Sequence, residues 1–208
     1  MPVWIPERVW DNQDVFIIGG GTSLERFDWS LLKNKNTIGC NDAYKHGIDI
    51  CKICIFGDIK WFELHRRDLV HYKGAVFTNA NKLYKSKFPW LWVMQREASG
   101  IHKNSLGWNY NTGASAVNLA VLLGAKQIFL LGFDMHLGKN GRNNWHDNKL
   151  NKPSIEVFPK FLQGFQHIAN DLKSKYSDVS ISNITDDSDL NLFPKIGVKE
   201  FWKKRKSK

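Results

Sequence analysis

Short apolar runs alternate with amphipathic stretches along most of the chain. Runs rich in β-branched and aromatic residues are predicted to be strands, at residues 15–18, 37–40, 53–56, 75–78, 128–131 and 179–181. Stretches with apolar residues at helical spacing are predicted to be helices, at residues 24–32, 59–70, 114–123 and 155–175. Gly124 directly follows the third of these helices and is a typical helix stop.

Several of the predicted strands are apolar without alternation, as in Val15-Phe16-Ile17-Ile18. Strands that are buried on both faces have this pattern, and they occur where helices cover both sides of a parallel sheet. The pattern therefore predicts an α/β fold, a Rossmann-like three-layer sandwich with a mostly parallel sheet. A single domain is expected over residues 1–194, followed by a basic tail at residues 195–208.

Residues 79–111 lack periodicity and are rich in Lys, Trp and Asn. Irregular segments of this length are uncommon in compact domains, and they are either functional or disordered. We expect a lid or a binding loop here, with disorder as the alternative.

Charge adds one feature to this picture, at the end of the chain. The formal net charge is +10, of which the tail contributes +6 and residues 1–194 only +4. The balance over residues 1–194 is ordinary for a globular domain, so composition alone does not indicate a nucleic-acid-binding protein. The tail also contains Phe201 and Trp202, and aromatic residues among cations suit attachment to an anionic membrane surface or to nucleic acid. A solvated chain end is the alternative.

The chain contains no run of about 18 apolar residues and no secretory signal pattern at its start. Its three cysteines are an odd number, which is typical of reduced thiols rather than of a disulfide framework. We expect a cytoplasmic protein, with the basic tail as a means of peripheral membrane attachment.

Glycine and polar residues directly follow four of the predicted strands. In a doubly wound sheet, ligands bind beyond the carboxyl ends of the strands, so these residues are expected to converge. Glycines let the backbone approach an anion, and helix N-termini favour negative charge. The sequence therefore predicts a nucleotide site. Its candidate residues are Gly19, Gly20, Gly21, Thr22, Ser23, Asn41, Asp42, Asp58 and Asp134.

The glycine turn differs from the two common phosphate-binding motifs. Leu24 stands where the dinucleotide fingerprint requires a third small residue, and no Gly-Lys-Ser/Thr follows for a P-loop. These differences exclude the ordinary NAD-binding and P-loop ATPase classes. A tight turn without a ligand is the alternative.

Three segments carry a resemblance to known families: GGGTSLERFDWSLL, IGCNDAY and TGASAVNLAVLLGAKQIFLLGFDMH. Together they resemble the bacterial sialyltransferases that build lipooligosaccharide. They are also similar to the motility-associated-factor glycosyltransferases and to archaeal hydroxymethylpterin diphosphokinases. The resemblance covers residues 15–183. Short phage-encoded proteins carry a similar Trp-His pair after the Gly-Phe-Asp turn.

The resemblance implies a CMP-sugar donor, with no further cofactor required. It places the cytidine monophosphate leaving group at Gly20, Gly21, Thr22, Ser23 and Asn41. Thr112 and Gly113 match a short motif that opens the helix facing the donor. Independently of the family, Asn111 or Thr112 can cap this helix, whose first amides then form a second anion site.

The segment after Asp134 offers acid–base chemistry. His146 is a base with a pKa near neutrality, and Lys139 and Arg142 are cations that could neutralise a departing phosphate. The family's base is a His in this region, which matches His146 first and His136 second. The family's phosphate-binding tyrosines are missing, because no Tyr stands between Tyr110 and Tyr176. Lys139, Arg142 or Trp145 would have to replace them.

We therefore expect a nucleotide-sugar-dependent glycosyltransferase that acts on a glycan or on a phage or host polymer. One alternative is a diphosphotransferase with Mg²⁺ on Asp42, Asp58 or Asp134, although single carboxylates at strand ends also cap turns. Another is a non-catalytic nucleic-acid-binding protein that uses the tail and the aromatic-basic residues 82–92.

Overall fold

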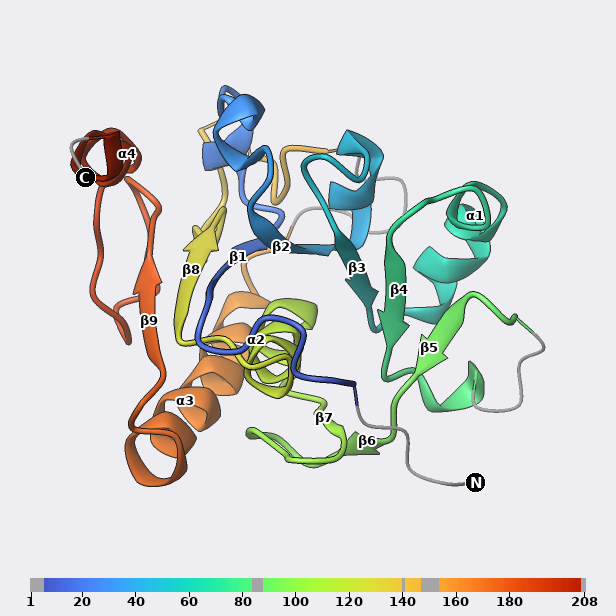
Figure 1. Ribbon diagram of the computed structural model, residues 1–208. Helices are drawn as coiled ribbons and strands as arrows, with labels where there is room; N and C mark the ends of the chain where they lie inside the picture. The colour runs from blue at the N-terminus through green and yellow to red at the C-terminus, as the bar shows by residue number, and fades with distance from the viewer. Residues whose placement is uncertain (1–5, 84–87, 140, 147–153, 207–208) are drawn as a thin grey trace.

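A parallel sheet of seven strands forms the centre of the computed structural model, which describes residues 6–83, 88–139, 141–146 and 154–206 (Figure 1). Every strand pairs in parallel with its neighbours, and the order is β5-β4-β3-β2-β1-β8-β9. The strands are β1 (Asp14–Ile18), β2 (Asn36–Cys40), β3 (Ile53–Phe56), β4 (Ala75–Thr78), β5 (Leu91–Val93), β8 (Gln127–Leu131) and β9 (Ser180–Asn183). The predicted α/β fold is confirmed, and the last predicted strand is shifted to 180–183.

The strand order contains a switch point between β1 and β8. From β1 the chain builds outward through β2, β3, β4 and β5, and it then returns by helix α2 (Thr112–Leu122) to place β8 on the other side of β1. A crevice forms at such a point because the connections on its two sides lead in opposite directions.

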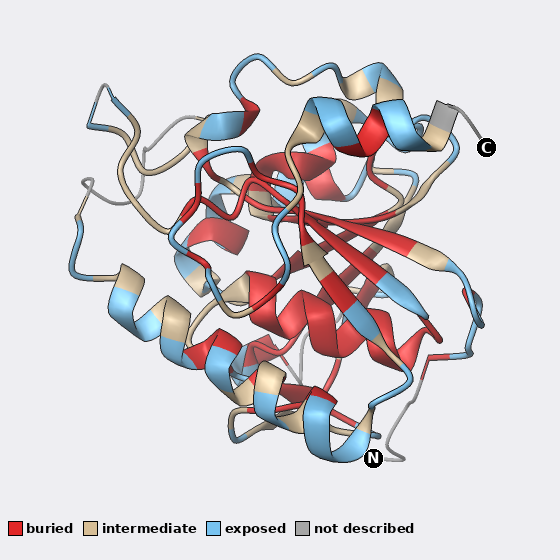
Figure 2. Cartoon of the chain, turned by 90° about the vertical axis from the view of Figure 1, so that its left-hand side faces the viewer, coloured by how far each residue is buried: buried red, intermediate tan, exposed pale blue. Residues whose placement is uncertain are grey.

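The two faces of the sheet are covered by different helices. Val15 and Ile17 of β1 pack toward α2 and α3 (Phe158–Lys175), and α2 lies between the sheet and α3. Phe16 and Ile18 point to the opposite face, where α1 (Ile59–Leu69) and α4 (Val198–Lys206) pack. Figure 2 shows most of the sheet and the helix packed beneath it in the buried colour, with some strand ends exposed. Burial on both faces explains why β1 is apolar without alternation.

The prediction of a helix at residues 24–32 is wrong. Two 3-10 turns replace it, Thr22–Leu24 and Trp29–Leu32. The carboxylate of Asp28 accepts a hydrogen bond from the backbone N–H of Ser30 at 3.1 Å, so Asp28 begins a new turn inside the stretch. Further 3-10 turns span Asn41–His46 and Asn81–Leu83.

The segment at residues 79–111 is regular in part, and some of its residues, such as Asn79, Arg96 and Trp108, border the cavity described below. The segment contains β5 and a two-stranded parallel sheet, β6 (Arg96–Glu97) with β7 (Leu106–Gly107). Strands of two or three residues are too short to produce a periodic pattern, which is why the sequence did not reveal them. Residues 84–87 lie outside the described part.

The C-terminal segment packs on the domain and does not extend from it as a tail. Phe201 and Trp202 are only 5% and 8% exposed, and Trp202 stacks on Phe16 with ring centroids 5.5 Å apart. The guanidinium of Arg205 lies 4.6 Å above the ring of Phe129. The prediction that these aromatic residues attach the chain to a membrane or to nucleic acid is therefore wrong. In the described ranges, no helix combines the length and apolarity needed to cross a bilayer.

Gly164, inside α3, provides a test of how tightly α3 packs. A Cβ at this position would stand 1.9 Å from the carbonyl oxygen of Asn109. Helix propensity alone predicts that Gly164→Ala stabilises the protein by about 1 kcal/mol. We expect the clash to reverse the sign and to cost about 1–3 kcal/mol in urea unfolding. The exposed control Lys173→Ala should be near neutral, and a more stable Gly164→Ala variant would contradict the packing.

Candidate active site

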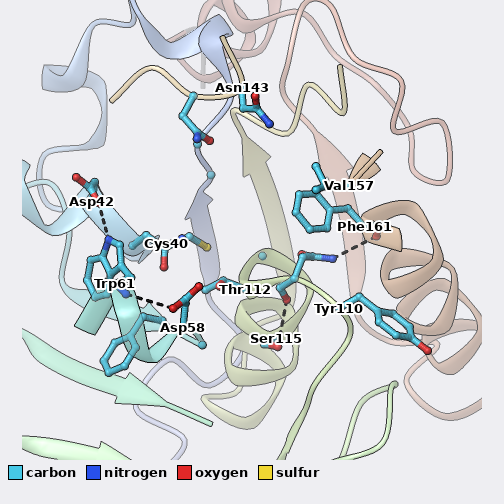
Figure 3. Close-up of a pocket in the computed structure, with 18 of the residues that line it drawn as sticks. Cys40, Asp42, Asp58, Trp61, Tyr110, Thr112, Ser115, Asn143, Val157 and Phe161 are labelled. Atoms are coloured by element: carbon cyan, nitrogen blue, oxygen red, sulfur yellow. Dashed lines mark hydrogen bonds between the residues drawn. The ribbon is translucent and has the colours of Figure 1, made fainter. Parts of the chain in front are cut away.

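A cavity of about 1230 Å³ lies at the carboxyl ends of the strands, above the switch point. The structure brings together there most of the residues that the sequence placed at strand ends. They are Gly19, Gly20 and Gly21 after β1, Asn41 and Asp42 after β2, Asp58 after β3, Asp134 after β8, and Thr112 and Gly113 at the start of α2. Figure 3 shows Asp42, Asp58 and Thr112 around this space.

The glycine turn is held by β8 and by the loop that follows it. The backbone N–H of Gly21 donates to the carbonyl of Gly132 at 2.8 Å, and a Cβ on Gly21 would stand 2.2 Å from Oδ1 of Asp134. Trp145 donates its backbone N–H to Gly20 at 2.9 Å and its indole N–H to the carbonyl of Gly19 at 3.1 Å. Small residues are therefore required by the packing of the turn itself.

Thr22 and Ser23 lie against the carboxylate of Asp134. Ser23 donates its backbone N–H and its hydroxyl to the two oxygens of Asp134, at 2.9 and 2.6 Å, and the hydroxyl of Thr22 lies 3.3 Å from the same carboxylate. The 3-10 turn after Gly21 directs both side chains toward the end of β8, away from the cavity. Both side chains therefore close the turn, and they border a smaller neighbouring hollow rather than the main cavity. Their place at the nucleotide stays a prediction.

Asn41 borders the cavity with an unusual backbone and side chain. Its φ is +52°, in the left-handed region, and its side-chain oxygen Oδ1 is buried without a hydrogen-bond partner. A buried acceptor without a donor costs about 1–3 kcal/mol. The hydrogen-bonding capacity of the Asn41 side chain is therefore left partly unused by the protein, which is uncommon for a buried polar atom.

Helix α2 begins at the cavity. The side chain of Asn111 accepts from the backbone N–H of Ala114 at 2.7 Å, so Asn111 is the N-cap. The first turn at Thr112 and Gly113 borders the cavity. The positive end of the helix dipole therefore points at the space where a ligand would bind.

Asp42 is the centre of a cluster of polar side chains that the sequence did not reveal. Its Oδ1 accepts from the indole N–H of Trp61 at 2.6 Å, and its Oδ2 accepts from the ammonium of Lys45. His65 lies 3.6 Å from Oδ1, and His146 lies 3.9 Å from Oδ2. Burial alone would raise the pKa of Asp42, but the hydrogen bonds from Lys45 and Trp61 and the proximity of His146 lower it below its usual value.

His146 reaches the cavity, whereas its two predicted cationic partners do not. Arg142 donates to the carbonyls of Trp145 and His146, each at 3.1 Å, and thereby fixes the loop that carries the histidine. Lys139 borders a separate hollow of about 270 Å³. Neither Lys139 nor Arg142 lines the main cavity, and their predicted role at a departing phosphate stays a prediction. The cations that border the main cavity include Lys45 and Arg96.

Each of the three carboxylates considered for Mg²⁺ accepts hydrogen bonds from protein donors. Asp58 caps α1 by accepting from the backbone N–H groups of Lys60 and Trp61, Asp134 binds the glycine turn, and Asp42 binds Lys45 and Trp61. Over the described ranges, no group of three or more His, Cys, Asp or Glu side chains is placed to share a metal ion.

One signal for the missed residues was present in the sequence. Trp61 and His65 are four residues apart in a predicted helix, so they share one face of it. Their stacked rings, with centroids 4.5 Å apart, face Asp42. No comparable signal indicated Arg96, which donates to the carbonyl of Asn79 at 2.8 Å and lies under the ring of Trp108.

The fold is shared with solved sialyltransferases. The monofunctional alpha-2,3-sialyltransferase Cst-I from Campylobacter jejuni gives a TM-score of 0.58 at 17% identity, over 88% of this chain and 80% of that chain. The sialyltransferase CstII from the same organism, in complex with cytidine-5'-monophosphate, gives 0.57 at 17% identity, over 88% and 84%. CST-II in complex with a trisaccharide acceptor and CMP gives 0.53 at 17% identity, over 89% and 86%. No protein-family model and no curated protein sequence matches the chain.

Proposed function

We propose that the protein is a glycosyltransferase that uses a CMP-linked sugar as its donor. The observation that carries this proposal is the convergence of Asn41, the N-terminus of α2 and His146 on one cavity at the switch point. The likeness to sialyltransferases solved with CMP supports the choice of nucleotide. The cavity exceeds the roughly 300–1,000 Å³ of common small-molecule sites, so it has room for a donor and an acceptor.

In this proposal the nucleotide lies between the glycine turn and α2. The first-turn amides of α2 hold the phosphate through hydrogen bonds and the helix dipole. Asn41 binds the nucleoside, and the donor group that its Oδ1 lacks in the free protein comes from a ligand N–H or O–H. Gly20 and Gly21 bring the backbone of the turn to the same side.

The proposed chemical step is a displacement at the anomeric carbon of the sugar. The acceptor hydroxyl gives its proton to His146 while its oxygen forms a bond to the anomeric carbon. The bond between that carbon and the phosphate oxygen breaks, and its electron pair leaves with CMP. The dipole of α2 stabilises the charge that develops on the phosphate.

Asn41→Gly tests the nucleotide site. Glycine tolerates the positive φ of Asn41, so the variant removes the side chain without adding backbone strain. We expect CMP affinity, measured by calorimetric titration, to fall by about 10- to 100-fold, the value of one or two hydrogen bonds.

The matched control is Asn34→Gly, because Asn34 also has a positive φ, of 60°, but is exposed and does not border the cavity. Its CMP affinity should equal that of the unmodified protein. Equal affinity in both variants would remove Asn41 from the site. Failure of CMP to bind, with tight binding of UDP or GDP, would overturn the cytidine assignment.

The two alternative functions find less support. A Mg²⁺-dependent diphosphotransferase would need carboxylates that the protein here uses for its own hydrogen bonds. A nucleic-acid site at residues 82–92 would need several exposed aromatic rings. Trp92 is exposed, but Phe88 and Trp90 pack against Phe62, with ring centroids 5.4 and 6.2 Å away.

A further inference from the structure

A single buried carboxylate lies between two imidazoles at the edge of the cavity. Each oxygen of Asp42 faces one of them: Oδ1 is 3.6 Å from Nε2 of His65, and Oδ2 is 3.9 Å from Nδ1 of His146. Both distances are longer than a hydrogen bond and within the range of strong charge interaction. Both histidine side chains are 14% exposed, so solvent screens these interactions only in part.

The orientation of His146 distinguishes its two ring nitrogens. Nδ1 faces Asp42, whereas Nε2 points to the glycine turn, 3.5 Å from the position that a Cβ on Gly20 would occupy. A neutral imidazole has one protonated nitrogen and one acceptor nitrogen. A neighbouring carboxylate favours the tautomer whose proton faces it. Nε2 is then the acceptor, on the side where the nucleotide is proposed.

The position of Asp42 does not depend on His146. Trp61 and Lys45 donate to its two oxygens, and α1 and the Asn41–His46 turn hold these donors in place. Other titratable groups at this cluster include His65 and Asp68 of α1, Tyr44, whose hydroxyl lies 3.0 Å from Nδ1 of His65, and the buried thiol of Cys54. Burial lowers the pKa of His65 and so disfavours its charged form. Lys45 is then the cation that competes with His146 for interaction with the Asp42 carboxylate.

We propose that Asp42 is a positioning residue that keeps His146 protonated at Nδ1, so that Nε2 accepts the proton of the acceptor hydroxyl. Asp42 does not contact the substrate in this arrangement, and it stabilises the imidazolium that forms when Nε2 takes the proton. The role in the reaction rests on the proposed function, whereas the tautomer is a property of the free protein.

The test is Asp42→Asn, observed by long-range ¹H–¹⁵N correlation spectra of ¹⁵N-histidine-labelled protein. These spectra distinguish a protonated ring nitrogen from an unprotonated one, and His146→Gln assigns the signals of His146. In the unmodified protein, we expect neutral His146 to carry its proton on Nδ1. In Asp42→Asn, we expect this preference to be lost and the pKa of His146 to fall by about 1 pH unit, because a negative charge has been removed.

His65→Gln is the matched control, since His65 faces the other oxygen of the same carboxylate. It should leave the tautomer of His146 unchanged. Lys45→Met is a second variant, which should change the pKa of His146 in the opposite direction and which serves as a test even if Asp42→Asn fails to fold. Removing the competing ammonium should raise the pKa of His146. An unchanged tautomer and pKa of His146 in Asp42→Asn, or an unchanged pKa in Lys45→Met, would overturn the proposal.

Kinetics separate this inference from the proposed function. If the reaction is sugar transfer, Asp42→Asn should lower kcat by about 10²-fold or more, with KM for the donor nearly unchanged. A lost tautomer preference in a protein that transfers no sugar would refute the function and leave the pairing intact. Transfer that depends on His146 but is indifferent to Asp42 would refute the pairing and leave the function intact.

Discussion

Replacing His146 by glutamine is expected to lower the rate of sugar transfer by about 10²–10⁴-fold, the usual contribution of a positioned general base. Glutamine occupies a similar volume but cannot take up a proton, so CMP affinity should remain as in the unmodified protein. The measurement is transfer from a CMP-sugar to a panel of glycan acceptors, followed by CMP release, together with a calorimetric CMP titration.

His136→Gln is the control for this prediction. Burial alone would lower the pKa of His136, but its hydrogen bond to the carbonyl of Leu137 and the proximity of Asp187 raise it above the ordinary value. A histidine with a raised pKa is less available as a base at neutral pH because a larger fraction of it is already protonated. The His136→Gln variant should keep most of its transfer rate. The opposite result, a slow His136→Gln and a normal His146→Gln, would move the base to His136.

Deleting residues 197–208 is expected to unfold the protein. Removal of a buried aromatic side chain costs about 3–5 kcal/mol, and this deletion removes both Phe201 and Trp202. It would also expose Phe16 and Phe129, against which the two rings pack. The total approaches or exceeds the roughly 5–15 kcal/mol by which most domains are stable. Circular dichroism and urea unfolding of the truncated chain measure the effect.

A charge variant separates packing from surface electrostatics. Lys199 is exposed on α4, and Lys199→Gln should leave the stability within about 0.5 kcal/mol of the unmodified value. A truncated chain that folds with normal stability would show that α4 contributes little to the core. We expect the truncated chain to lose CMP binding together with its fold.

The sequence predicted the sheet because burial on both faces leaves a strong signal. β1, β3 and β8 each contain four consecutive apolar residues, a pattern that predicts a buried strand. The sequence-based prediction missed helix α4 and treated this segment as a tail. Its buried and half-buried residues nevertheless follow the spacing of one helix face, at Val198, Phe201, Trp202 and Arg205. The lysines between them dominate the composition, and the guanidinium of Arg205 is itself packed over aromatic rings.

The position of the site was predictable, whereas the directions of its side chains were not. Parallel strands must present their carboxyl ends at one edge, and that topology alone brings Asn41 and Asp134 near the glycine turn. The choice of Asp134 as the partner of Ser23, and of backbone carbonyls as the partners of Arg142, depends on turn geometry that no local pattern encodes. The approach of His146 to Asp42 likewise joins segments that are far apart in the chain.

The two hydrogen bonds from Trp145 to the glycine turn have a consequence for the timing of the reaction. Many transferases complete their site only when a loop closes, and the microsecond-to-millisecond motion of that loop then limits turnover. Here the two hydrogen bonds of Trp145 connect the residue next to it, His146, to Gly19 and Gly20 of the glycine turn. If His146 is the base, its position is therefore coupled to the glycine turn, and we expect bond making or the release of CMP, rather than a movement of His146, to limit turnover.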